Sequence, residues 1–229
     1  MILPRPVVAV VFDMDGLLFD TERLYEKAFF SASAELGHAA DGEVFSLLIG
    51  APWPTGRQIL LDRYGPDFRV DDLTAVWMGH FKKLIEVDLP LKPGALELLA
   101  LLDQLDLPRA IATSSSHNTV AHHLAMHKLA DRFHAVIAAG DYDRGKPHPD
   151  PFLLAAVRLG VEPADCIALE DSFHGVRAAH AAGMMTVMVP DMLQPTAEIR
   201  ALCAAVAESL LEVPALITSS RRGFEAASS

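Results

Sequence analysis

The sequence is poor in cysteine, in aromatic side chains and in positive charge. Two of its 229 residues are cysteines, 7% are aromatic, and 30 acidic residues outnumber 19 Lys and Arg, which gives a net charge of −11. Two cysteines cannot build a disulfide framework, and Cys166 falls inside an apolar segment, so we expect a reduced, cytoplasmic protein. The negative charge argues against nucleic acid as the main partner.

Long hydrophobic runs are also missing. No segment approaches the ~18 consecutive apolar residues of a membrane helix, and the first residues lack the basic start of a signal peptide. We therefore expect no membrane partner. With 51% hydrophobic residues, the chain can bury a full core and a small second domain.

What the sequence does contain is a short apolar run, residues 7–12, followed by Asp13, Asp15 and Gly16. An apolar run of this length is typical of a strand buried on both faces. Two carboxylates at the point where a strand leaves the core are costly unless a cation or a reaction uses them. Taken alone, this motif also suits an ordinary turn.

Polar residues follow three later apolar segments in the same way. The segments cover residues 109–112, 135–139 and 166–169. The polar residues beyond them are Thr113, Ser114, Ser115, Lys146, Glu170 and Asp171. In a doubly wound α/β sheet the carboxyl ends of all parallel strands lie at one edge, where ligands bind. We therefore expect these side chains to converge with Asp13 and Asp15.

One long helical stretch interrupts this alternation of strands and helices. Residues 17–89 are predicted to be mostly helical with no second buried strand, and the core pattern resumes after residue 90. The predicted fold is a Rossmann-like doubly wound parallel sheet made by residues 1–17 and 91–229, with a helical domain, 18–90, inserted. The expected helices include 22–36, 72–85, 95–105, 150–160 and 196–211, with a frayed tail from Ser219.

The order of these motifs resembles the haloacid dehalogenase superfamily of phosphoryl-transfer enzymes. The segment from Phe12 to Glu22 is similar to the β-phosphoglucomutase-like branch, which also contains many phosphatases of sugar phosphates and nucleotides. The resemblance extends over about residues 7–190 and implies that the helical insert is a cap domain. It implies that Asp13 is the nucleophile that forms an aspartyl-phosphate, and that Asp15 is the general acid and base.

Four acids at one edge of a sheet repel each other. Two unit charges about 4 Å apart cost on the order of 4 kcal/mol at an effective dielectric constant near 20. A divalent cation removes this cost, and an all-oxygen donor set favours Mg²⁺ over Zn²⁺. By the resemblance, the metal ligands are Asp13, the backbone carbonyl of Asp15 and Asp171, with Glu170 acting through water or as an outer partner.

The resemblance also assigns the phosphate site. Ser114 matches the hydroxyl that donates to the phosphoryl oxygens, with Thr113 and Ser115 beside it, and Lys146 pairs with the acids and the phosphoryl group. A dehalogenase has no leaving oxygen to protonate and its branch lacks the second aspartate, so Asp15 argues against dehalogenation.

The expected substrate contacts are Tyr25, Trp53, His117 and Asn118. The mutase of this branch has a histidine and an arginine where this chain has Tyr25 and Trp53, which makes water the expected phosphoryl acceptor. The sequence thus predicts a Mg²⁺-dependent phosphatase, acting as a monomer on a small phosphorylated metabolite such as a sugar phosphate or nucleotide. The alternatives are a β-phosphoglucomutase-type mutase and a non-catalytic phosphometabolite-binding protein.

We expect no catalytic role for two lysines of the insert or for three histidines of one helix, and we expect Trp53 to lie in a loop. A phosphonate-cleaving enzyme would need a buried cap lysine, and nothing marks Lys82 or Lys83 as buried. His122, His123 and His127 include one pair at i and i+4 on a predicted helix, and because this pair has no third metal ligand, we expect the histidines to face solvent. Trp53 is expected in a loop, residues 50–56, rich in proline and glycine.

Overall fold

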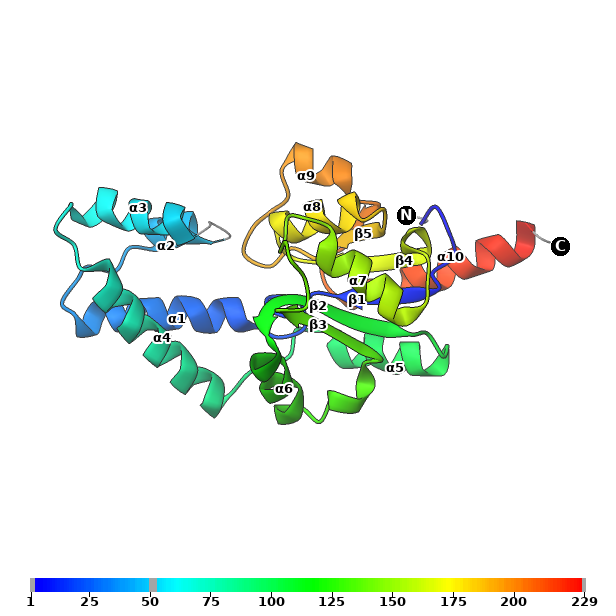
Figure 1. The fold of residues 1–229 in the computed structure, drawn as a ribbon, viewed down its shortest axis with the longest axis horizontal. Coiled ribbons are helices and arrows are strands. Elements are labelled where there is room, and N and C mark those ends of the chain that lie inside the picture. The colour runs from blue at the N-terminus through cyan, green and yellow to red at the C-terminus, as the bar shows by residue number, and fades with distance from the viewer. Residues whose placement is uncertain (1–2, 50–52, 228–229) are drawn as a thin grey trace. The chain divides into compact units, whose positions relative to one another are not determined.

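The computed structural model describes residues 3–49 and 53–227 (Figure 1). It contains two compact units. Unit 1 comprises Met1–Phe19 and Leu91–Ser229, and unit 2 comprises Asp20–Pro90. The helical insert of the sequence is unit 2, and the α/β pattern belongs to unit 1.

Unit 1 is built on a six-stranded sheet in which every strand pair is parallel, in the order β3-β2-β1-β4-β5-β6. The strands are β1 (Ala9–Phe12), β2 (Arg109–Ser116), β3 (Ala135–Ala139), β4 (Cys166–Glu170), β5 (Met185–Met188) and β6 (Ala205–Val206). The strand order reverses beside β1, where β2 and β4 pair on its two sides. This confirms the predicted doubly wound parallel sheet.

Helices cover both faces of this sheet. They are α5 (Ala95–Gln104), α6 (His117–Met126), α7 (Asp150–Leu159), α8 (Phe173–Ala181), α9 (Ala197–Leu202) and α10 (Val213–Ala227), with short 3-10 turns at Ala130–Arg132 and Pro163–Asp165. In Figure 1, α5 and α6 lie below the strands, while α7 and α8 share one hydrophobic cluster with residues of β1, β2 and β4. Small residues let α7 and α8 approach the sheet closely, because Ala155, Ala156 and Ala178 belong to the same buried cluster as Ala168 of β4.

The described residues of unit 2 form four helices: α1 (Thr21–Glu35), α2 (Gly42–Leu48), α3 (Trp53–Tyr64) and α4 (Val70–Val87). Its core is aromatic, with Phe29, Phe45 and Trp77 all at most 1% exposed. The Trp77 indole Nε1 donates to the backbone carbonyl of Tyr25 at 2.8 Å, which satisfies the polar end of a buried ring. Lys82 and Lys83 are both exposed, which fits their predicted lack of a catalytic role.

The C-terminal part of the chain differs from the prediction. The expected single helix 196–211 is wrong, because α9 ends at Leu202 and the chain then adds β6 beside β5. The tail predicted to fray from Ser219 is helical as far as Ala227 in α10, whose residues Val213 and Ile217 are fully buried. A buried apolar stripe stabilises a helix more than its polar surface residues weaken it.

Two smaller differences concern the loops. The strand predicted for 109–112 continues through the hydroxyl motif to Ser116. In the segment 50–56, α3 already begins at Trp53, and residues 50–52 lie outside the described residues. Across the parts of the chain that the structure describes, no helix is both long and apolar enough to cross a membrane.

Candidate active site

The carboxyl edge of the central strands carries the acidic residues. Asp13 follows β1 directly, Glu170 ends β4, and the Asp13 amide donates to the carbonyl of Leu169 at 2.9 Å. This point lies where the strand order reverses, which is the usual ligand site of an open α/β sheet.

Lys146 joins two of these carboxylates. Its Nζ lies 2.5 Å from Oδ1 of Asp13 and 2.5 Å from Oε1 of Glu170. All three side chains are buried, at 6%, 10% and 0% exposure for Lys146, Asp13 and Glu170. The Lys146 ammonium also lies 5.2 Å from the ring centre of Phe152. One lysine therefore lies between two acids, and all three of these side chains are largely shielded from water.

The protonation of this cluster follows from burial. The pKa of Asp13 is raised to about 8, chiefly by desolvation and also by the charges of Glu170 and Asp15, while Lys146 opposes this rise. Burial works against the charge on Lys146, yet Asp13 and Glu170 outweigh this and raise its pKa above the ordinary value. Lys146 is thus a permanent cation, and Asp13 needs a further positive charge to ionise fully at neutral pH.

The site offers ligands for such a charge. Asp13, Glu170 and Asp171 each present a carboxylate oxygen within 4.8 Å of the others. Hard oxygen donors of this kind suit a divalent metal ion. A raised pKa, as at Asp13, is expected for a carboxylate whose charge is to be neutralised by a cation from outside the chain.

The carboxylate of Glu170 is held in place by Ser172 at the start of α8. Its Oε2 accepts hydrogen bonds from the Ser172 amide at 3.2 Å and the Ser172 hydroxyl at 3.0 Å. The Ser172 hydroxyl also caps α8 by accepting from the Gly175 amide at 3.0 Å. Gly175 leaves the room that the carboxylate fills, because a Cβ at that position would lie 1.8 Å from the Glu170 carboxyl carbon.

Asp15 accepts a hydrogen bond from the hydroxyl motif. The Ser115 hydroxyl donates to Oδ2 of Asp15 at 2.7 Å, across 100 positions of sequence. Thr113 is 1% exposed, accepts from the Ser115 amide at 3.0 Å, and accepts at its carbonyl from the Tyr142 hydroxyl at 3.0 Å. Ser114 lies between them with an exposed side chain. The motif thus alternates between structural bonds and a hydroxyl open to a ligand.

His117 and Asn118 begin α6 at the same edge of the sheet, and both are exposed. The Nε2 atom of His117 lies 2.9 Å from Oδ2 of Asp141, which also accepts from the Ala138 amide at 3.0 Å. The hydrogen bond from the Ala138 amide and the one from His117 hold the pKa of Asp141 below its usual range. The imidazole is therefore held by an anion rather than free to turn.

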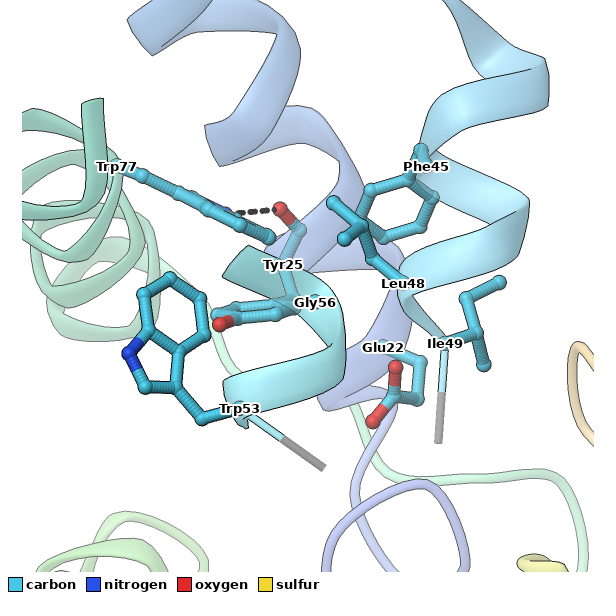
Figure 2. A pocket seen from close by; sticks show the side chains of 8 residues that line it. All are labelled: Glu22, Tyr25, Phe45, Leu48, Ile49, Trp53, Gly56 and Trp77. Atoms are coloured by element: carbon cyan, nitrogen blue, oxygen red, sulfur yellow. Dashed lines mark hydrogen bonds between the residues drawn. The ribbon is translucent and has the colours of Figure 1, made fainter. Parts of the chain in front are cut away.

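The other two predicted contacts lie in unit 2. Tyr25 and Trp53 line a pocket of about 270 Å³ whose walls include Phe45 and Trp77 (Figure 2). The rings of Tyr25 and Trp77 lie with their centres 4.2 Å apart and their planes tilted by 31°, while Trp53 is 45% exposed. Among the described residues that line this pocket, Glu22 alone carries a charge. Its walls suit an uncharged group better than a second phosphate.

The histidine prediction is wrong at one position. His122 is exposed and His127 is half-buried, but His123 is 3% exposed and its Nδ1 lies 3.9 Å from Oδ1 of Asp15. Burial lowers the pKa of His123, despite the opposing effect of Asp15. The signal was present in the sequence, because Val120, His123 and Leu124 share the buried face of α6.

Comparisons with known proteins match this arrangement. A model of the haloacid dehalogenase-like hydrolase family matches residues 7–183. The chain is 32% identical to hexitol phosphatase B of Escherichia coli K12, over 83% of this chain and 86% of that protein. It is 37% identical to the probable pseudouridine-5'-phosphatase of Drosophila melanogaster, over 82% of this chain and 83% of that protein. A crystal structure of a family hydrolase from Deinococcus radiodurans R1, with bound phosphate and sodium, is similar with a TM-score of 0.79 at 28% identity; the match covers 94% of this chain and 97% of that one.

Proposed function

Because this chain belongs to the haloacid dehalogenase-like hydrolase family, we propose that it is a Mg²⁺-dependent phosphatase of a small phosphorylated metabolite. The observation that carries the proposal is the buried contact of Lys146 with Asp13 and Glu170, next to Asp171 and the Ser115-bound Asp15. Phosphoryl transfer needs an in-line nucleophile and neutralisation of charge, and this cluster provides both.

In the proposed reaction, Asp13 attacks the phosphorus atom and becomes an aspartyl-phosphate. Asp15 gives a proton to the leaving oxygen as its bond to phosphorus breaks, and then takes a proton from the water that hydrolyses the intermediate. The exposed Ser114 hydroxyl and the Lys146 ammonium bind the phosphoryl oxygens. Asp13, Asp171 and the backbone carbonyl of Asp15 would hold the Mg²⁺, with Glu170 acting through water or as an outer partner, and the ion would supply charge neutralisation when bound.

The substrate class follows from the relatives and from unit 2. The two curated relatives are named for a hexitol phosphate and for pseudouridine 5'-phosphate, so we propose a sugar, polyol or nucleoside monophosphate. The pocket around Tyr25 and Trp53 supports a substrate with one phosphate, because its charged wall residue is acidic. We propose that Tyr25, Trp53, His117 and Asn118 contact the organic part of the substrate.

A panel of phosphate monoesters, assayed for phosphate release with Mg²⁺, tests this proposal. Asp13→Asn should abolish turnover and leave the fold intact, whereas Asp131→Asn, which changes an exposed acid of unit 1, should keep full activity. Asp15→Asn should slow ester hydrolysis by about 10²–10⁴ while Mg²⁺ affinity changes much less. Activity in excess chelator, or in Asp13→Asn, contradicts the mechanism.

The same assay separates the two alternatives. Incubation with β-glucose 1-phosphate and a bisphosphate activator should release inorganic phosphate. Conversion to glucose 6-phosphate without phosphate release would instead favour the mutase. Tight binding of phosphate esters without any turnover would favour the non-catalytic binding protein.

A further inference from the structure

A buried histidine nitrogen faces the carboxyl group of Asp15 without reaching it. Nδ1 of His123 has no hydrogen-bond partner among residues 3–49 and 53–227. It lies 3.9 Å from Oδ1 of Asp15, about 1 Å longer than a hydrogen bond. A buried polar atom without a partner is costly, so a small movement that joins the two atoms is favourable.

The surroundings of His123 keep its ring in this orientation. The helix α6 buries His123 between Val120 and Leu124, and the ring of Phe19 packs against the imidazole edge-on, with centres 5.5 Å apart and planes at 69°. His123 therefore moves little, and Asp15, whose side chain is 30% exposed, is the group free to close the gap.

The two oxygens of Asp15 face different donors. Oδ2 accepts from the Ser115 hydroxyl at 2.7 Å, and Oδ1 is the atom nearest to His123. Ser115 alone leaves the carboxyl group free to rotate about that one bond, whereas a second donor on the other oxygen fixes its plane. Fixed orientation of a reacting group is a large part of catalytic rate.

We propose that His123 is a positioning residue that, together with Ser115, orients the carboxyl group of Asp15 for proton transfer. The inference rests on the proposed phosphatase function. As the bond between phosphorus and the leaving oxygen breaks and the phosphoryl group joins Asp13, the proton of Asp15 passes to the leaving oxygen. Asp15 is then a carboxylate that accepts from the Ser115 O–H and the His123 Nδ1–H. Hydrogen bonds to an ionised acceptor are the stronger ones, so both donors favour the release of the proton.

A pair of His123 variants of nearly equal shape tests the proposal. His123→Asn keeps an N–H donor near the place of Nδ1, while His123→Leu removes it. The readout is kcat/KM for two substrates, p-nitrophenyl phosphate and the best alkyl phosphate of the panel. The p-nitrophenolate leaving group departs without a proton from Asp15, whereas the alcohol of the alkyl phosphate needs that proton to leave. kcat/KM covers the steps up to departure of the leaving group, so it isolates this proton transfer.

We expect His123→Leu to lower kcat/KM for the alkyl phosphate by about tenfold to a hundredfold, and for p-nitrophenyl phosphate by less than about threefold. His123→Asn should restore the wild-type ratio of the two values within about threefold. His122→Leu, which changes the exposed neighbour on the same helix, should match wild type with both substrates.

Equal losses with both substrates in His123→Leu would show that His123 only packs, and would overturn the inference. If His123→Leu does not fold, His123→Met, which also lacks the donor, takes its place and the same outcomes decide, while a changed substrate ratio in His123→Asn also overturns the inference. Failure of the wild-type protein to release phosphate from either ester would overturn the proposed function itself, which is a separate outcome.

Discussion

Replacing Gly175 by alanine should disturb the acidic cluster although none of the cluster's own residues is substituted. The added Cβ would lie 1.8 Å from Cδ and Oε1 of Glu170 and 2.1 Å from Oε2. Real contacts of a Cβ are essentially never shorter than 3.0 Å, so the carboxylate must move by more than 1 Å. Such a shift breaks the bonds of Glu170 to Lys146 and to Ser172.

The size of the effect follows from two opposing contributions. Breaking a buried charge pair costs about 3–5 kcal/mol. Alanine in place of glycine inside a helix returns up to about 1 kcal/mol. We therefore expect Gly175→Ala to lower the free energy of unfolding by about 2–4 kcal/mol, and to weaken Mg²⁺ binding because Glu170 has moved.

Urea unfolding and titration calorimetry with Mg²⁺ measure these two effects. The matched control is Gly79→Ala in α4, where nothing lies within 4 Å of the added Cβ, so that variant should be neutral or slightly stabilised. In a Glu170→Ala background the clash is gone, and Gly175→Ala should then cost little. An equal cost in both backgrounds, or no cost in the wild-type background, would refute the reasoning.

Three further predictions concern protonation, the helical insert and thiol reactivity. Burial raises the pKa of Asp13 from 3.8 to about 8, so the folded metal-free protein holds a proton that the unfolded chain releases. In chelator, the free energy of unfolding should therefore fall as pH rises between these two pKa values, by up to about 1.4 kcal/mol per pH unit relative to Asp13→Asn. Urea midpoints that change with pH in the same way for both proteins would contradict this. Trp77→Phe removes the donor to the Tyr25 carbonyl and should cost about 1–3 kcal/mol by urea unfolding; an unchanged midpoint would show that the carbonyl finds another donor. Burial raises the pKa of Cys166 to about 12, so in a Cys203→Ser variant a thiol reagent should label no cysteine until urea unfolds the chain, and rapid labelling of the native protein would show that β4 opens.

The strands, and the residues that we propose for most of the site, could be predicted because their signals lie in contiguous residues. The apolar run before Asp13, and the cap formed by Ser172, both appear within a few positions of sequence. The C-terminal helix could not be predicted in this way. Whether Cys203–Val206 continues a helix or adds an edge strand depends on the free edge of β5, which only the assembled sheet provides.

The chemistry that we propose for the site therefore follows from the sequence itself, since residue type and position after each strand select the proposed nucleophile, lysine and metal ligands. The contacts that tune this chemistry were decided by tertiary structure. Ser115 reaches Asp15 across 100 positions, Gly175 clears space for Glu170, and the rotation of α6 turns His123 inward. Contacts of this kind depend on how a helix face packs on the sheet, and no local pattern around Asp15 or Glu170 specifies that packing.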